Sequence, residues 1–356
     1  MDVPRIHTAL TLQGGGALGA YEYGAVLALY RRGVRPRVVT GVSIGAYMAA
    51  ILAGSRGDPL KALGEMWEAL SLSGPSLLPN PLAQGLSIFG NWGMYQVSPA
   101  FFSAPFFADS VYDLSPMREA LERWVDFERL NASDVRVVVT AVDVETGDLA
   151  EFDNRQGLRA EHILASASMP PAFPAATVDG RRYWDGGLIA NAPLRPAVNA
   201  LEELCQCEPD FRQELFVVDL FRRRASMPET MPDVVERAFE LSFFGKLQHD
   251  LKLFENFNDF VELLERMDQT LPADSPLRKH AAYRRLSRHR RIDRLWVVSG
   301  AAPERLGGPA DFSESALRER VRLGYRDGLR CLQRRDPRRR RRKADVSTEL
   351  TQESEQ

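Results

Sequence analysis

Cysteine and histidine are scarce in this chain. It has three cysteines and five histidines among 356 residues. Three cysteines cannot build a disulfide framework, and the Cys205-x-Cys207 pair lacks a second cysteine or histidine pair at zinc-ligand spacing. We therefore expect no disulfide scaffold, no metal ion and no cofactor, and we interpret the cysteines as ordinary thiols of a reducing compartment.

Long apolar runs and a secretion signal are also missing. No run of roughly 18 apolar residues occurs, and the first residues lack a basic segment followed by an apolar one. Hydrophobic residues make up 44% of the chain and charged residues 26%, which is ordinary globular usage. The expectation is a soluble cytoplasmic protein, with peripheral membrane contact left open.

Net charge is nearly absent, but the charge is unevenly distributed. The formal net charge is −2, while residues 278–294 and 334–343 each carry eight Lys or Arg and one acid. The simpler interpretation is a solvated helix face and a solvated tail. The alternative is attraction to anionic lipid. No nucleic-acid recognition motif accompanies the basic residues, so no nucleic-acid partner is expected.

Charge is missing altogether from residues 69–108, which contain five prolines and several aromatic residues. Proline at this density prevents one long helix, and a long connection in a compact domain is usually functional or disordered. Because ligand pockets are mainly apolar, we interpret the stretch as the wall or lid of an apolar binding pocket. Its proposed lining is Phe101, Phe102, Phe106 and Phe107, and the alternative is an ordinary buried core segment.

The first 55 residues alternate between strand and helix patterns. Apolar residues 7–12 and 37–40 read as buried strands, and residues 17–32 and 46–53 have helical spacing. Short connections between such elements favour a parallel sheet covered by helices. Further strands are expected near 135–144, 149–153, 178–184, 215–221 and 295–299, with mostly helical structure after residue 231.

A glycine-rich turn follows the first expected strand. It comprises Gly14, Gly15, Gly16, Ala17, Leu18 and Gly19, which match the G-x-G-x-x-G pattern of dinucleotide sites. Such a site also needs an acidic residue after the second strand, and no Asp or Glu lies between Tyr23 and Gly57. Backbone N–H groups at a helix N-terminus suit a developing oxyanion equally well.

A second motif, Gly41-Val42-Ser43-Ile44-Gly45, fits G-x-S-x-G between a strand and a small-residue helix. That context is typical of a nucleophile elbow, whose sharp turn exposes the serine hydroxyl. The simpler alternative is a serine that only caps a helix. The context favours Ser43 as a nucleophile.

A third motif, Asp185-Gly186-Gly187, ends a later expected strand. A serine nucleophile needs a general base, usually a histidine. None of the five histidines follows a strand end in a loop, so a carboxylate that acts directly on the serine is the remaining candidate.

Together the three motifs resemble those of the patatin-like phospholipases, in order and rough spacing, over residues 5–200. The resemblance implies a three-layer α/β/α sheet with a nucleophile elbow, followed by a mostly helical extension (201–336). The charged composition of residues 337–356 predicts a disordered tail. The resemblance also implies a Ser43–Asp185 dyad, an oxyanion hole in the glycine loop, an acyl-enzyme and a lipid or acyl-ester substrate. We expect the uncharged stretch to form the pocket for the acyl chain of that substrate. An α/β-hydrolase with a Ser-Asp-His triad and a non-catalytic lipid-binding protein stay open as alternatives.

Overall fold

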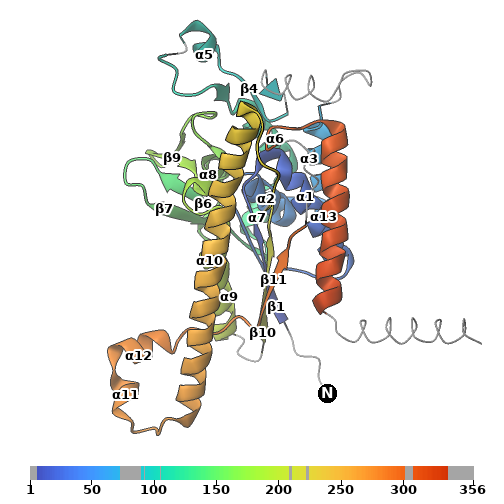
Figure 1. Ribbon diagram of the computed structural model, residues 1–356. Helices are drawn as coiled ribbons and strands as arrows, with labels where there is room; N and C mark the ends of the chain where they lie inside the picture. The colour runs from blue at the N-terminus through green and yellow to red at the C-terminus, as the bar shows by residue number, and fades with distance from the viewer. Residues whose placement is uncertain are drawn as a thin grey trace, which may run out of the picture.

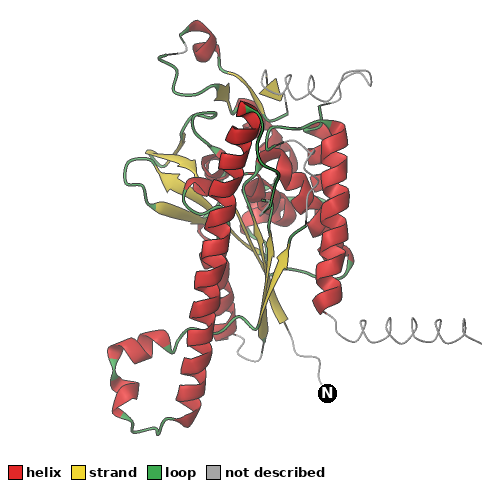
Figure 2. Ribbon diagram, in the orientation of Figure 1, coloured by secondary structure: helices red, strands yellow, loops and turns green. Residues whose placement is uncertain are grey.

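A single twisted sheet forms the centre of the computed structural model, which describes residues 6–72, 90–91, 93–104, 106–207, 211–221, 224–300 and 308–335 (Figures 1 and 2). The order of its strands is β11-β10-β1-β2-β6-β9-β8, and β7 also pairs with β6. The strands are β1 (Ile6–Leu12), β2 (Val38–Gly41), β6 (Arg136–Asp143), β7 (Leu149–Asp153), β8 (Ala176–Val178), β9 (Arg181–Asp185), β10 (Arg212–Val218) and β11 (Arg294–Val298). A small separate sheet contains β3 (Gly90–Asn91), β4 (Tyr95–Val97) and β5 (Tyr112–Asp113).

The central strands β11, β10, β1, β2 and β6 run parallel, and β7, β8 and β9 are antiparallel additions at one side. Parallel strands are buried on both faces, which explains their nearly continuous apolar sequences. Successive side chains alternate between the faces: Ala9 and Leu215 pack with α9, whereas Leu10 and Phe216 belong to the larger core on the other face. The helix layers on both faces confirm the predicted three-layer α/β/α architecture.

The helices occupy both faces and one end of the sheet. They are α1 (Gly19–Arg31), α2 (Ile44–Gly54), α3 (Pro59–Ala69), α5 (Pro99–Ser103), α6 (Ser115–Trp124), α7 (Phe127–Asn131), α8 (Ala160–Ala167), α9 (Leu194–Cys207), α10 (Met231–Thr270), α11 (Pro276–Lys279), α12 (Ala281–Leu286) and α13 (Glu314–Arg335). Short 3₁₀ turns cover Gly16–Leu18, Asn154–Gln156 and Gly186–Leu188. No helix among these described elements is both long and apolar enough to cross a bilayer.

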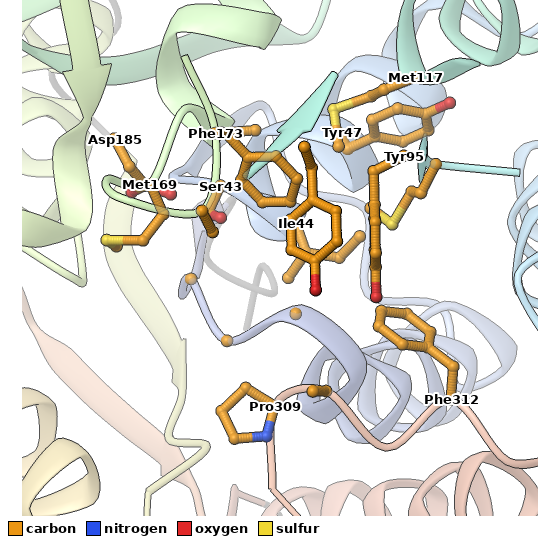
Figure 3. Close-up of a pocket in the computed structure, with 18 of the residues that line it drawn as sticks. Ser43, Ile44, Tyr47, Tyr95, Met117, Met169, Phe173, Asp185, Pro309 and Phe312 are labelled. Carbon is orange, nitrogen blue, oxygen red and sulfur yellow. The ribbon is translucent and has the colours of Figure 1, made fainter. Parts of the chain in front are cut away.

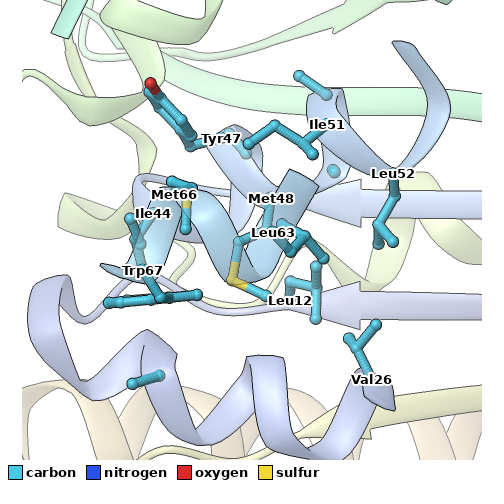
Figure 4. Close-up of a cluster of buried hydrophobic side chains, with 14 of the residues drawn as sticks. Leu12, Val26, Ile44, Tyr47, Met48, Ile51, Leu52, Leu63, Met66 and Trp67 are labelled. Atoms are coloured by element: carbon cyan, nitrogen blue, oxygen red, sulfur yellow. The ribbon is translucent and has the colours of Figure 1, made fainter. Parts of the chain in front are cut away.

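Helix α2 is the most completely buried helix around the site, because it lies between the sheet and α3. Figure 4 shows Ile44, Met48 and Ile51 of α2 packed among Leu12 of β1 and Leu63 of α3. Its small residues, several of them alanine, let the helix lie close to the strands. This packing holds the N-terminal end of α2, where Ser43 lies.

The central sheet continues past residue 200, where we expected the catalytic domain to end. Strands β10 and β11 lie beyond it in sequence, yet they pair with β1 in the same sheet. Helix α13 packs along α1, from the opposite end of the chain. A parallel sheet takes its strands from any part of the chain, so the weaker motif content after residue 200 did not mark a separate core. The predicted tail, 337–356, lies outside the described residues.

Candidate active site

Ser43 lies on the sharp turn between β2 and α2. Its backbone has φ 57° and ψ −126°, an uncommon conformation for a residue with a side chain. Its N–H donates to the carbonyl oxygen of Ser166 (3.0 Å) and to the Ser166 hydroxyl (3.1 Å), which hold the turn. This is the geometry of a nucleophile elbow.

The two glycines of the elbow are needed because strand and helix approach each other closely. A Cβ atom at position 41 would lie 2.4 Å from the carbonyl oxygen of Gly45, and one at position 45 would lie 2.7 Å from that of Leu12. Both distances are too short for any larger residue. The G-x-S-x-G spacing therefore follows directly from backbone packing.

Asp185, at the end of β9, is completely buried next to Ser43. One carboxylate oxygen, Oδ1, accepts a hydrogen bond from the Gly187 N–H (2.7 Å). Burial raises the Asp185 pKa to about 7, opposed by the Gly187 N–H, the Ser43 hydroxyl and the positive charge of Lys246. A carboxylate with this pKa is suited to accept a proton near neutral pH.

The serine hydroxyl and the carboxylate face each other without a hydrogen bond of ordinary geometry. The Ser43 hydroxyl lowers the Asp185 pKa, yet Asp185 Oδ2 has no hydrogen-bond partner among the described residues. Hydrogen bonds between catalytic groups often become short and aligned only in the reacting complex. In Figure 3 the two side chains lie at the same end of the cavity.

The glycine loop reaches the same place from the end of β1. Gly14, Gly15 and Gly16 line the cavity beside Ser43. The predicted donors Ala17 and Gly19 are engaged elsewhere: the Ala17 N–H donates to the Pro309 carbonyl oxygen (2.8 Å), and the Gly19 N–H donates to carbonyls within the turn. We therefore do not assign these two N–H groups to the oxyanion hole: that of Ala17 is bonded to the segment before α13, and that of Gly19 is bonded within the turn.

A largely apolar cavity of about 250 Å³ opens from the two catalytic candidates. Figure 3 shows its wall of aromatic and methionine side chains. These come from α2, the small sheet, α6, the segment after α8, α10 and the segment before α13: Tyr47, Met94, Tyr95, Tyr112, Met117, Met169, Phe173, Phe243 and Phe312.

The phenylalanines predicted to form the acyl pocket do not line this cavity. Phe102, Phe106 and Phe107 are 73%, 96% and 91% exposed, and Phe101 is half-buried outside the lining. The uncharged stretch contributes Met94 and Tyr95 instead. Composition alone could not tell which aromatic residues of the stretch face this cavity. Residues 73–89, 92 and 105 of the stretch lie outside the described residues.

The three motifs fall within a region that matches a known protein family. The model of the patatin-like phospholipase family matches residues 10–198, which contain the glycine loop, the elbow and the Asp-Gly-Gly turn. The chain belongs to this family. Relatives include the patatin-like phospholipase domain-containing protein 7 of Mus musculus, 28% identical over 188 residues, which are 52% of this chain and 12% of the mouse protein.

A patatin-like phospholipase domain-containing protein of Aspergillus niger is 45% identical over 56 residues, 16% of this chain and 8% of that protein. This chain therefore matches only a small share of the length of these patatin-like relatives. Among solved structures, VipD from Legionella pneumophila aligns with 93% of this chain and 67% of that chain, at TM-score 0.40 and 14% identity. The ExoU–SpcU complex of Pseudomonas aeruginosa aligns with 94% and 52%, at TM-score 0.38 and 15% identity.

Several side chains that sequence reasoning missed complete this patatin-like site. Asn191 is buried between two of the motifs: its Nδ2 donates to the Gly14 carbonyl oxygen (3.0 Å), and a Cβ at position 14 or 187 would lie only 2.7 Å from its Oδ1. Asn191 therefore bonds to the glycine loop and packs closely against the Asp-Gly-Gly turn. Its place six residues after Asp185 was the only sequence signal.

Lys246 reaches the site from α10, outside the residues that match the patatin-like family model. Its Nζ donates to the carbonyl oxygens of Gly187 (3.1 Å) and Leu188 (2.6 Å) and lies 5.1 Å from the centroid of the Phe243 ring. Burial lowers the Lys246 pKa, and the charge of Asp185 opposes that shift. The lysine thus holds the turn that carries the candidate catalytic carboxylate.

Arg320 of α13 supports the other side of the site. Its buried guanidinium donates to the carbonyl oxygens of Asp311 (2.6 Å), Gly308 (3.1 Å) and Ala17 (3.3 Å). The segment it holds contributes Pro309 and Phe312 to the cavity wall. No local pattern in the sequence marked this arginine, because its partners are backbone carbonyls, two in the segment before α13 and one at Ala17.

No group of three or more His, Cys, Asp or Glu side chains within the described ranges could hold a metal ion. All five histidines are described, and none of them lines the cavity. His7 stacks on Phe211 at 4.0 Å, and His289 pairs with Glu202 at 3.0 Å.

Proposed function

We propose that this chain is a serine acyl-ester hydrolase of the lipase or phospholipase type, with Ser43 as nucleophile and Asp185 as general base. The observation that carries the proposal is the strained Ser43 turn beside a fully buried carboxylate, at one end of an apolar cavity. Family membership supports a lipid ester as the class of substrate.

In the first half of the reaction, the Asp185 carboxylate accepts the proton of Ser43 Oγ as that oxygen attacks the ester carbonyl carbon. The N–H groups of Gly15 and Gly16, for which the described residues offer no acceptor, stabilise the oxyanion. Each such donor contributes about 3 kcal/mol to the transition state. The C–O bond to the alcohol then breaks, and Asp185 returns the proton to the leaving oxygen.

In the second half, Asp185 takes a proton from water, and the hydroxide oxygen attacks the acyl-serine. Collapse of the second tetrahedral intermediate releases the fatty acid, and the proton returns to Ser43. The apolar cavity would hold the acyl chain, because Met117, Phe173 and Phe312 offer it no polar partner.

The direct test uses Ser43→Ala and Asp185→Asn in hydrolysis of p-nitrophenyl acyl esters. Both variants should lose turnover by at least a thousandfold while they keep the circular dichroism spectrum of the parent protein. Full activity in folded Asp185→Asn would refute the dyad and favour a histidine as the general base. A non-catalytic lipid-binding role is separated by a fluorophosphonate probe, which should label the parent protein and not Ser43→Ala.

Peripheral contact with an anionic membrane through the basic stretches is a further part of the proposal. The structure limits it, because Arg278, Arg291 and Arg294 form ion pairs with acids of the protein. The positive charge that residues 278–294 offer to a membrane is therefore smaller than composition indicates. Most of the second stretch, 334–343, lies outside the described residues.

A further inference from the structure

Three phenylalanines that do not line the cavity lie on a loop that projects from the molecule. The aromatic loop, defined here as residues 98–104 and 106–111, connects β4 and β5 and contains α5. Phe102, Phe106 and Phe107 are its most exposed apolar side chains, at 73%, 96% and 91%. Figure 1 shows α5 at the top of the molecule, beyond the sheet and its helices.

The backbone of the aromatic loop is held by hydrogen bonds although these three rings are exposed. The Ser98 N–H donates to the Val111 carbonyl oxygen (2.9 Å) and closes the base of the loop, and the Phe107 N–H donates to that of Ala104 (2.9 Å). The Tyr112 N–H donates to the Ala172 carbonyl oxygen (2.8 Å), which anchors the loop to the wall of the cavity. A defined backbone that presents several aromatic rings to water marks an interaction surface.

The base of the aromatic loop is also part of the cavity. Tyr95 of β4 and Tyr112 of β5 both line it, and their rings are 4.8 Å apart. The loop therefore leads directly from the proposed acyl-binding wall to its exposed tip. A partner that binds the tip is held at the same side of the molecule as the cavity.

The chemistry of the loop favours a lipid surface over a protein. Residues 98–108 carry no charged side chain, and Asp109 pairs with Arg182 (3.4 Å). Stable protein interfaces have a polar rim and bury about 800 Å² per partner. Three phenylalanines supply roughly 150–250 Å² of buried area each. Their sum is smaller than the area that a stable interface with a second copy of this chain would bury. Insertion into a bilayer needs no such continuous area, because each ring is buried independently.

We propose that Phe102, Phe106 and Phe107 insert into a phospholipid bilayer surface and hold the cavity against it. The basic residues 278–294 are less suited to this task. Figure 1 shows α11 and α12, which contain part of this stretch, at the end of α10 far from the aromatic loop. From Lys246 to the end of α10 at Thr270, the helix rises by about 36 Å. The aromatic loop, in contrast, lies at the cavity's own end of the molecule.

The test is flotation of the full chain with neutral phosphatidylcholine vesicles. The variant Phe102→Ser/Phe106→Ser/Phe107→Ser should bind at least tenfold more weakly than the parent. The matched control, Leu241→Ser/Leu253→Ser/Leu263→Ser, removes three exposed apolar side chains of α10 and should bind as the parent does. The serine variant of the loop should keep the parent rate on p-nitrophenyl acetate, a soluble substrate.

Several results would overturn the proposal: no binding of the parent to neutral vesicles, equal loss in both triple variants, or binding that requires anionic lipid. A parent dimer that becomes monomeric in the loop variant, seen by sedimentation velocity, would assign the loop to a second copy instead. The proposed hydrolase activity is tested separately, because Ser43→Ala should bind vesicles like the parent. If the parent protein is inactive on esters but binds vesicles, and the loop variant does not bind them, only the hydrolase proposal fails.

Discussion

Replacing Lys246 with methionine should shift the pH dependence of catalysis. The lysine charge opposes the burial that raises the Asp185 pKa to about 7. Without this charge the Asp185 pKa should rise further, and the carboxylate form that accepts the serine proton should predominate only at higher pH. An opposite charge close to a carboxyl lowers its pKa by 1–3 units.

Lys246 is the smallest of the influences that lower the Asp185 pKa, so we take the low end, about one unit. Below the pKa the carboxylate fraction falls tenfold for each unit. We therefore expect kcat/KM of Lys246→Met to be about tenfold below the parent at pH 6, with a much smaller difference at pH 9. Lys246→Arg should keep most of the parent profile, because it retains the positive charge.

The assay is kcat/KM for p-nitrophenyl butyrate between pH 5 and 9.5. Lys252→Met is the matched control, because it removes an exposed lysine from the same helix and should leave the profile unchanged. An unchanged profile in folded Lys246→Met would refute the electrostatic argument. A decrease in kcat/KM of equal size at every pH would mean that the lysine acts only by holding the Gly187 and Leu188 carbonyls in place.

Three further predictions concern stability and the cavity. Asp185→Asn should stabilise the fold at pH 8–9 by up to roughly 4 kcal/mol, because a pKa raised from 3.8 to about 7 means that the ionised carboxyl destabilises the folded state. In urea unfolding, this gain should vanish below about pH 4, where the carboxyl is neutral in the folded and the unfolded state. Arg320→Met leaves buried carbonyl oxygens without their donor, so it should cost about 3 kcal/mol in unfolding free energy and lower kcat; unchanged stability would contradict this role. Ala172→Phe narrows the cavity and should reduce hydrolysis of a palmitoyl ester at least tenfold more than that of an acetyl ester; equal losses would mean that the cavity does not hold the acyl chain.

The parallel part of the fold was predictable because its signals are local. Apolar runs that end in Gly14 and in Gly41 gave the first two strands, and helical spacing gave α1 and α2. The turn between β6 and β7 was also predicted, and Val142 and Leu149 flank it as a register pair. Strands β10 and β11 were also expected, but their place in the same sheet as β1 was not, because they lie far along the chain from that strand.

Within the candidate site, residues were predictable where the backbone itself restricts the residue type. Gly41 and Gly45 are required by close approach, and this requirement is visible as a pattern. Asn191, Lys246 and Arg320 escaped prediction because each donates to a backbone carbonyl that is distant in sequence, those of Gly14, Leu188 and Ala17 respectively. Such contacts leave no periodicity or spacing in the sequence.

By itself the sequence determined the motifs, their order and the α/β class, because steep backbone turns and buried strands restrict residue types over a few positions. The tertiary structure alone decided which groups meet. The sheet order brings the turns after β1, β2 and β9 together, and α10 and α13 add Lys246 and Arg320 from far along the chain. It also decided that Tyr95 faces the cavity while Phe106 faces solvent, because side-chain direction depends on strand pairing and loop path rather than on hydrophobicity.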